Sequence, residues 1–428
     1  MAWSNQSKEY EKVLEVGRPP NIVRLFPNSK GLIVSGKFID RALTAKGHAM
    51  TIAANGRNHI IIRGVLAAAQ KANAAVIIEI AKSEGGAKSY CAVNYWNMAR
   101  QVDAVLNELG ITVPVAVHAD HYGIKNENDL VRAKVEVPTM FEAGITSIAV
   151  DASHLPDADN LLSSIALNPY IPKWAGLETE VGEIKGNIGL STPEDALFLI
   201  QGLNAHDIFP DWIALNNGTT HGIQDASAGI QVDLTAEVHK AIAPYGVSGA
   251  QHGTSGNSSE RLRQIAAKTR TTKANVATAL QMVSWGVEID DYGNAILKDN
   301  QLVKVPGHGM SEELWAEIKA VGEEKKYKAG DFKNLNLPFE NKILSQPREI
   351  RERMAKAVED FVYKLLTEVF NGTDTAPIVY ETIMKVKGFD PGLKASRIED
   401  PSEWTEAKIR EKAKALAPDT SPKGNFDD

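Results

Sequence analysis

From about residue 49 onward, short apolar segments alternate with longer segments in which apolar residues recur at helical spacing. Such alternation is typical of β/α units built around a parallel sheet. The apolar segments with the length of buried strands are residues 50–54, 76–80, 113–117, 147–150, 176–180, 212–215, 247–251 and 272–276. Eight strands alternating with helices predict an α/β fold of the (β/α)8 TIM-barrel class.

Two of the predicted helices have clear sequence signals. Residues 61–71 are rich in Ala, Leu and Ile, and Thr192 precedes the segment Pro193-Glu194-Asp195. Threonine is a favourable helix cap and proline fits the first helical position. We therefore expect a helix to begin at Pro193.

The chain changes character after about residue 300, where Lys and Glu become more frequent. Residues 348–370 carry apolar side chains at helical spacing. We expect a barrel with an N-terminal lead-in over residues 1–300 and a mainly helical C-terminal extension over residues 301–428. Residues 417–428 have no apolar period, so we expect them to be a mobile tail.

The composition limits the classes of partner. With 43% hydrophobic residues, the chain of 428 residues can bury a substantial core. Its 47 basic and 54 acidic residues give a net charge of −7, which argues against a broad surface for nucleic acid or anionic membrane. A small-molecule ligand is the expected partner.

Two features bear on location. Cys91 is the only cysteine, so the chain cannot form an internal disulfide, which fits a reducing compartment. The sequence shows neither a signal-peptide core nor an apolar run of membrane length. We expect a soluble, cytoplasmic protein in which Cys91 is a packed thiol.

Four of the ten histidines follow predicted strands: His118, His121, His221 and His252. The C-terminal ends of barrel strands converge on one mouth, where barrel enzymes place their sites. Three neutral imidazoles, those of His121, His221 and His252, leave a fourth position of Zn²⁺ open, as in catalytic zinc sites. Asp120 beside them could relay a proton while the metal polarises a carbonyl.

Most histidines need no such role, because a histidine in an apolar context is often a hydrogen-bonded structural residue. We expect this role for His48, His59, His206, His239 and His308. His118 has two readings: it orients the Asp120 carboxylate, or it serves as an alternate ligand.

Acidic residues end two further strands. Strand alternation should direct Glu178 and Glu180 to the same side. Either glutamate could be a solvated rim charge, but next to a histidine-rich site Glu180 could be an occasional metal ligand or a base. Asp151 has the same ambiguity, and it could instead cap the next helix.

A Gly-Thr-Ser-Gly segment follows His252 directly. Its backbone amides and hydroxyls could surround a phosphate at a fixed distance from the metal. Gly222, after His221, could add another close backbone approach. Arg348 opens a predicted helix and could clamp a second phosphate, although an isolated surface arginine is the simpler reading.

Six segments occur in the order typical of the class II fructose-bisphosphate aldolase family, which the chain resembles over about residues 40–285. They are His118-Ala-Asp120-His121, Asp151-Ala-Ser153, Glu178-Thr-Glu180-Val-Gly182, Gly218-Thr-Thr-His221-Gly222, His252-Gly-Thr-Ser-Gly256 and Lys273-Ala-Asn275-Val276. The resemblance implies that His121, His221 and His252 bind a catalytic Zn²⁺. It also implies that Asp120 gives a proton to the aldehyde-derived oxygen.

The resemblance implies a substrate site as well. The residues assigned to the dihydroxyacetone phosphate portion are Gly222, Gly253, Ser255 and Asn275. Asn55 is similar to the family's substrate-side asparagine, and Arg348 to the arginine that reaches the distal phosphate, often from a neighbouring subunit. Glu180 and Asp151 would lie near an alternate metal position. By the same analogy we expect a homo-oligomer, with room for an activating monovalent cation.

The chain departs from the family pattern in two places. The family usually has a mobile loop whose glutamate removes the C3 proton, but here no residue clearly replaces that base. Glu183 is the first candidate because it is nearest the strand end, whereas Glu194 fits a helix start. The second departure is at Ala277 and Ala279, where the family typically carries aspartates that organise substrate hydroxyls.

The leading hypothesis is a zinc-dependent aldolase that reversibly cleaves fructose 1,6-bisphosphate to dihydroxyacetone phosphate and glyceraldehyde 3-phosphate. One alternative is an aldolase of the same fold that acts on another ketose phosphate, because Ala277 and Ala279 remove expected polar contacts. Another is a non-catalytic barrel scaffold or regulatory subunit. A zinc hydrolase is a third, although it gives no reason for the glycine-rich phosphate loop.

Overall fold

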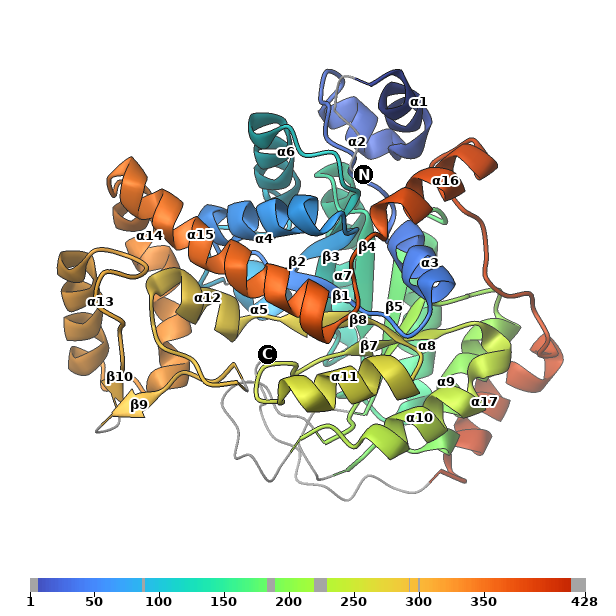
Figure 1. Ribbon diagram of the computed structural model, residues 1–428. Helices are drawn as coiled ribbons and strands as arrows, with labels where there is room; N and C mark the ends of the chain where they lie inside the picture. The colour runs from blue at the N-terminus through green and yellow to red at the C-terminus, as the bar shows by residue number, and fades with distance from the viewer. Residues whose placement is uncertain are drawn as a thin grey trace.

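The computed structural model describes residues 7–86, 89–182, 189–218, 229–291, 293–298 and 301–416. At its centre, parallel strands pair in chain order and close into a barrel where β8 meets β1 (Figure 1). The strands are β1 (Thr51–Asn55), β2 (Val76–Ala81), β3 (Val115–Gly123), β4 (Ser147–Asp151), β5 (Gly176–Val181), β6 (Trp212–Leu215), β7 (Ser248–Gln251) and β8 (Thr271–Val276). The predicted (β/α)8 TIM-barrel class is confirmed.

Helices surround the barrel because each strand is covered on its outer face as well as filled on its inner face. The helices that follow the strands are α4 (His59–Ala72), α5 (Lys82–Gly85), α6 (Met98–Leu109), α7 (Glu127–Glu142), α8 (Asp157–Leu167), α9 (Pro193–Ala205), α10 (Val232–Ala241), α11 (Ser259–Lys268) and α12 (Thr278–Trp285). All residues of β2 are buried, which explains why five of its six residues are apolar.

The two helices with sequence signals form, and the second begins at Pro193 as predicted. Helix α4 contains residues 61–71. At α9, the Thr192 hydroxyl accepts a hydrogen bond from the Asp195 amide at 3.2 Å, and the Asp195 carboxylate accepts one from the Thr192 amide at 2.9 Å. This reciprocal pair satisfies amides at the helix start that have no partner within the helix.

The N-terminal end of the barrel is closed by helix α3 (Gly36–Lys46) and by a late segment of the chain. The Lys394 ammonium forms an ion pair with Asp40 of α3 and donates hydrogen bonds to the Asp211 carbonyl at 2.9 Å and the Ser248 hydroxyl at 3.2 Å. These contacts tie α3 to β7 and to the residue before β6. Preceding α3 are α1 (Lys8–Gly17) and α2 (Pro20–Leu25).

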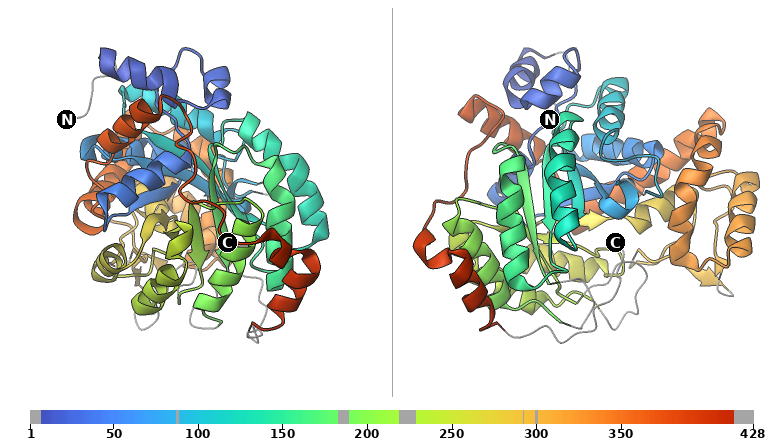
Figure 2. Two further views of the ribbon diagram at one scale, coloured as in Figure 1. Left: turned by 90° about the vertical axis from the view of Figure 1, so that its right-hand side faces the viewer. Right: turned by 180° about the vertical axis from the view of Figure 1, so that it is seen from behind.

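The chain after residue 300 is mainly helical, as predicted. Its elements, with the adjoining short strand β9 (Leu297–Lys298), are β10 (Gln301–Leu302), α13 (Glu312–Glu324), η3 (Ala329–Leu335), α14 (Asn336–Leu344), α15 (Arg348–Lys364), η4 (Leu365–Val369), α16 (Ala376–Val386), η5 (Pro401–Trp404) and α17 (Glu406–Ala413). In Figure 2, α13 and α14 form a lobe beside the barrel, and the final helix returns to its far side against α8 and α9.

Helix α15 packs along α4 and against α12 (Figure 1). Its Val358 and Val362 belong to the same apolar core as the barrel strands. The boundary at residue 300 stays a prediction, and the proposed tail over residues 417–428 lies outside the described residues. None of the helices in the described ranges is both long and apolar enough to cross a membrane.

Six expectations about individual residues concern positions away from the site. Cys91 is buried, and burial raises the pKa of its thiol well above the ordinary value, so the packed thiol is confirmed. Four of the histidines expected to be structural make ring hydrogen bonds away from the barrel mouth: His48, His59, His206 and His239. The fifth, His308, is exposed.

His239 makes the fold sensitive to acid. Its side chain is 2% exposed, and burial is the main cause that lowers its pKa from 6.5 to about 3. The unfolded chain therefore takes up a proton below pH 6.5, while the folded chain does so only near pH 3. The stability that the neutral imidazole contributes is present above pH 6.5 and is lost as the pH falls through this window.

We predict that the lowered pKa of His239 alone decreases the free energy of unfolding by about 2 kcal/mol when the pH falls from 6.5 to 5. Urea unfolding of the wild type and of His239→Gln at both pH values should show the difference between their unfolding free energies shrinking by that amount on acidification. Replacing the exposed His308 by Gln is the matched control. An unchanged difference between the two pH values would show that His239 does not govern this loss.

Candidate active site

Strand β3 extends beyond its predicted end. The sequence predicts an end at residue 117, whereas the strand continues to Gly123. Its register with β4 shifts after Ala119, and His121 has a positive φ of 42°. Adjacent residues of a regular strand face opposite sides, but such an irregularity re-aims side chains. Asp120 and His121 consequently line the same cavity.

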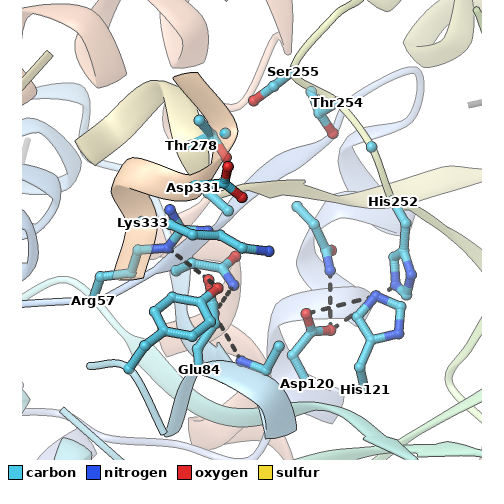
Figure 3. Close-up of a pocket in the computed structure, with 17 residues that line it drawn as sticks. Arg57, Glu84, Asp120, His121, His252, Thr254, Ser255, Thr278, Asp331 and Lys333 are labelled. Carbon is cyan, nitrogen blue, oxygen red and sulfur yellow. Dashed lines mark hydrogen bonds and ion pairs between the residues drawn. The ribbon is translucent and has the colours of Figure 1, made fainter. Parts of the chain in front are cut away.

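This cavity has a volume of about 270 Å³ and lies at the C-terminal mouth of the barrel. Figure 3 shows Asp120, His121 and His252 pointing toward one another on one side of it. The predicted site residues that line it are Asn55, Asp120, His121, His252, Gly253, Ser255 and Asn275. Residues from β1, β3, β8 and the segment after β7 are thus brought to one place.

The two described histidines of the predicted zinc site are in direct contact. The ring centroids of His121 and His252 are 4.1 Å apart. Nδ1 of His121 lies 3.1 Å from Glu180 Oε1 and 3.5 Å from Asp151 Oδ2. Nε2 of His252 lies 2.8 Å from Glu178 Oε1. Glu178 and Glu180 therefore face the same side of β5, as strand alternation predicts.

These residues fit a divalent metal ion. Nε2 of His252 is placed to donate a hydrogen bond to Glu178, and in that tautomer Nδ1 carries the lone pair of the ring. Nδ1 is buried and makes no hydrogen bond to any residue in the described ranges, so its lone pair suits a metal ion. Burial and the nearby Asp151 raise the pKa of Glu180 well above its ordinary value, a cost that a bound cation would relieve. Among the described residues, four sets of ligand atoms lie within 4.8 Å of one another: Asp120, His121 and His252; His121, Asp151 and Glu180; Glu178, Glu180 and His252; and Glu79, His118 and Asp120.

Three further predicted site residues belong to segments that the structure does not describe, and a fourth, Arg348, does not line the cavity. His221, Gly222 and Glu183 lie outside the described residues. Arg348 begins α15 with a side chain that is 83% exposed, and its Nε donates to Glu352 at 2.7 Å. Its expected reach toward a neighbouring subunit stays a prediction.

Beneath the cavity, the barrel encloses a charge cluster that sequence reasoning did not assign. The ammonium of Lys273, on β8, lies 2.9 Å from Glu178 Oε2, 3.0 Å from Glu79 Oε2 and 3.3 Å from Asp120 Oδ1. Lys273, Glu79 and Glu178 are fully buried. A signal was present, because Lys273 and Glu79 interrupt otherwise uncharged strands, and buried charges occur almost only in pairs.

The cluster sets the charge of the site. Burial raises the pKa of Asp120, but Lys273 and the three nearby imidazoles lower it more, so this pKa lies well below its ordinary range. The same balance, with Lys273 again the largest opposing cause, lowers the pKa of Glu178 to about 2. Both carboxylates are therefore ionised at neutral pH.

His118 lies next to the charge cluster and is itself neutral. Burial and Lys273 lower its pKa to about 3, so its ring is neutral. Its Nδ1 lies 2.7 Å from the Ser147 hydroxyl, and its Nε2 lies 3.5 Å from Glu178 Oε2 and 3.8 Å from Asp120 Oδ1. Both readings of His118, the orienting residue and the alternate ligand, stay predictions.

A second wall of the cavity is built around Glu84. This carboxylate accepts hydrogen bonds from Asn55 Nδ2 at 2.5 Å and from Arg57 Nε at 2.6 Å, while Nη1 of Arg57 donates to Gln281 at 2.7 Å. Figure 3 shows Arg57 and Glu84 across the cavity from the histidines. The sequence reasoning missed both residues, although each follows a predicted strand closely.

Comparison with known proteins identifies the family of the chain. The family model for class II fructose-bisphosphate aldolases matches residues 38–371. A fructose-bisphosphate aldolase from Streptococcus pneumoniae serotype 4 is 31% identical over 261 residues, which cover 58% of this chain and 80% of that protein. One from Staphylococcus aureus strain Mu50 is 30% identical over 133 residues, or 31% of this chain and 42% of that protein.

Solved structures share the fold. The YdjI aldolase from Escherichia coli K12 superposes with a TM-score of 0.52 at 18% identity, over 81% of this chain and 100% of that one. Fructose-bisphosphate aldolase from Campylobacter jejuni gives a TM-score of 0.53 at 18% identity, over 80% and 97%. The match of the family model over most of the chain is the decisive finding: the chain belongs to the class II fructose-bisphosphate aldolase family.

Proposed function

We propose that the protein is a metal-dependent aldolase that reversibly cleaves fructose 1,6-bisphosphate to dihydroxyacetone phosphate and glyceraldehyde 3-phosphate. The observation that carries the proposal is the buried, ionised Asp120 beside His121 and His252 in the cavity of a chain from this family. A general base and a set of metal ligands at one barrel mouth are what aldol chemistry requires.

Zn²⁺ is the proposed metal, with His121 and His252 as ligands and His221 as the third. Glu180 and Asp151 are the acidic residues that could hold the ion at an alternate position. A bound divalent ion would act as a Lewis acid that polarises the ketone and stabilises the enolate formed on cleavage. Asp120 lies beside His121 and His252, and its proposed role is proton transfer rather than metal binding.

Asp120 is proposed to move the proton of the C4 hydroxyl. In the cleavage direction it must accept this proton, and the low pKa set by Lys273 keeps the carboxylate ready to do so. In the condensation direction the protonated carboxyl returns the proton to the new alkoxide. Nδ2 of Asn275 donates to Asp120 Oδ1 at 3.0 Å and fixes its orientation.

The segment after β7 is proposed to hold the phosphate of dihydroxyacetone phosphate. The Ser255 hydroxyl is buried and makes no hydrogen bond to a residue of the described ranges. Asn257 fixes the turn by donating to the Gly253 carbonyl at 2.9 Å. An unused hydroxyl on a fixed turn suits a phosphate oxygen. Gly222 is proposed as a further contact, and Glu183 as the base for the C3 proton.

A second candidate function is the cleavage of a different ketose phosphate. Ala277 lines the cavity at a position where the family typically carries an aspartate, so one polar contact to substrate hydroxyls is absent there. A non-catalytic scaffold and a zinc hydrolase are the remaining alternatives. The homo-oligomer, the cytoplasmic location and a monovalent cation stay predictions.

Metal removal tests the proposal directly. We expect EDTA to abolish release of triose phosphate from fructose 1,6-bisphosphate and Zn²⁺ to restore it, because the histidines alone cannot stabilise the enolate. His252→Ala should lose metal and activity together, and His48→Ala should keep both. Metal binding without cleavage of any ketose phosphate would favour a scaffold, and cleavage that survives chelation would refute the metal.

Asp120→Asn preserves the shape of the side chain but removes its basicity. We expect kcat for cleavage to fall by about 10²–10⁴, while bound Zn²⁺ stays at the wild-type level. Exchange of the C3 proton of dihydroxyacetone phosphate with solvent deuterium, followed by NMR, should continue because that step uses another base. Cleavage at the wild-type rate would remove Asp120 from the reaction.

Lys273→Met should destabilise the fold, because it leaves Glu79 and Glu178 buried without their counter-charge. The expected loss is about 3–5 kcal/mol in the free energy of unfolding, measured by urea denaturation. The double variant with Glu79→Gln should recover part of this loss, and Lys268→Met on the surface should cost little. A single variant as stable as the wild type would show that Lys273 does not hold the cluster.

A further inference from the structure

A second cavity lies behind the turn that follows β7. Its volume is about 360 Å³, which is in the lower range of pockets for small molecules. Thr254 and Ser255 line both this cavity and the active-site cavity, so the turn separates the two spaces. We call the second space the rear cavity.

The walls of the rear cavity are largely apolar and come from three parts of the chain. These parts are β8 with the helix after it, α11, and the end of α15 with η4. Helix α11 contacts η4, and α12 contacts α15, so the three parts lie next to one another (Figure 1). The apolar residues that line the space include Leu262, Val276, Phe361, Leu365 and Val369.

Small residues leave room in this cavity. Residue 279 is an alanine, and a Cβ on Gly293 would lie 3.4 Å from the Ala279 Cβ and 3.8 Å from the Ser255 Cα. Gly293 has a positive φ of 74°, which favours glycine. Ala279 lines the rear cavity, whereas Ala277 lines the active-site cavity. A larger side chain at position 279 would therefore occupy the rear cavity.

The end of α15 changes to a π-helix at the rear cavity. In η4 the Phe370 amide donates to the Leu365 carbonyl at 2.8 Å, five residues back in the chain. A π-helical turn is rare and frequently occurs at functional sites. Both end residues of this turn, Leu365 and Val369, line the space. The distortion of the helix thus coincides with the cavity.

The rim of the rear cavity carries both signs of charge. Lys364 is exposed, and its ammonium makes no ion pair or hydrogen bond to a residue of the described ranges. Asp291 is exposed as well, and its described partner is the Ser259 hydroxyl, which donates to its Oδ1 at 3.0 Å. Asp290 next to it accepts the Asn294 amide at 2.9 Å and supports the local turn.

This pattern is complementary to a zwitterion with an apolar side chain. The apolar walls favour burial of a hydrocarbon group, and the rim offers one cation and one anion. A fatty acid could pair only with Lys364, and an alkylamine only with Asp291. Each of these would use half of the rim, whereas an α-amino acid would use both charges.

We propose that the rear cavity binds an apolar α-amino acid, with its side chain inside, its carboxylate at Lys364 and its ammonium at Asp291. This site goes beyond the proposed aldolase function, because binding there needs neither metal nor sugar phosphate. Its effect on the reaction does rest on that function. The bound amino acid supports the turn at Ser255 from behind and so strengthens binding of the phosphate on the other side.

Isothermal titration calorimetry of the full-length protein, without metal or sugar phosphate, tests the site. L-leucine and L-phenylalanine should bind at one per chain, and glycine should bind about tenfold more weakly or worse, because it buries no side chain. Leucine without its ammonium, 4-methylpentanoate, and leucine without its carboxylate, 3-methylbutylamine, should both bind more weakly than leucine. Failure of both amino acids to bind would overturn the proposal, and so would an analogue that binds as tightly as leucine.

Three variants test the location of the site. Lys364→Ala and Asp291→Asn should each raise the Kd of leucine by about fivefold, the effect of one exposed ion pair. Lys268→Ala removes an exposed lysine of α11 outside the cavity and is the matched control. Ala279→Leu should abolish binding by filling the space. Unchanged Kd values in the two rim variants would place the ligand elsewhere, and these variants decide the question even if Ala279→Leu fails to fold.

The effect on the turn is measured in the protein loaded with Zn²⁺. Saturating leucine should lower the Kd of dihydroxyacetone phosphate by about twofold or more, and dihydroxyacetone phosphate should lower the Kd of leucine by the same factor. Unchanged Kd values would overturn the effect while the binding site stands. A protein that binds leucine as predicted but cleaves no ketose phosphate would confirm the site and defeat the aldolase proposal.

Discussion

The ammonium of Lys273 is the counter-charge on which the arrangement of the barrel interior depends. It contacts carboxylates from three other strands, Glu79 on β2, Asp120 on β3 and Glu178 on β5. Taking such groups out of water is costly, and the cost is met only if opposite charges are in direct contact. Because Lys273 is fully buried, solvent contributes nothing to this balance. The cluster therefore couples the closure of the barrel to the ionisation of Asp120.

The same cluster explains how a histidine site can lie directly above a charged core. Glu178 uses one oxygen for Lys273 and the other for His252, so the charge that stabilises the lysine also orients the imidazole. His118 stays neutral in this surrounding and adds no positive charge beside Lys273. At the opposite end of the barrel, a separate pair of Lys394 and Asp40 closes the structure. Stability at the lower end and chemistry at the mouth thus rest on different ion pairs.

The fold was predictable because its signals are local. Strands such as β2, β4 and β6 are short and largely apolar, and Thr192 and Asp195 form the cap that their spacing predicts. The convergence of Asp120, His121 and His252 was also predictable, since the C-terminal ends of barrel strands always meet. What the sequence could not show is the irregularity in β3, because the register of one strand depends on both of its neighbours.

The unpredicted parts of the site arise from contacts between segments distant in the chain. No local pattern joins Arg57 to Gln281 or Gln281 to Phe332, yet these hydrogen bonds connect the segment after the first strand, the helix after the last strand and η3. Strand β8 and the helix that follows it carry Lys273, Asn275, Ala277 and Gln281 within nine residues. One continuous segment therefore sets the charge of Asp120, leaves space at Ala277 and anchors the extension that faces this space. A change in the extension can alter the wall of the cavity that η3 provides while the ion pairs that hold the barrel and its histidines stay as they are.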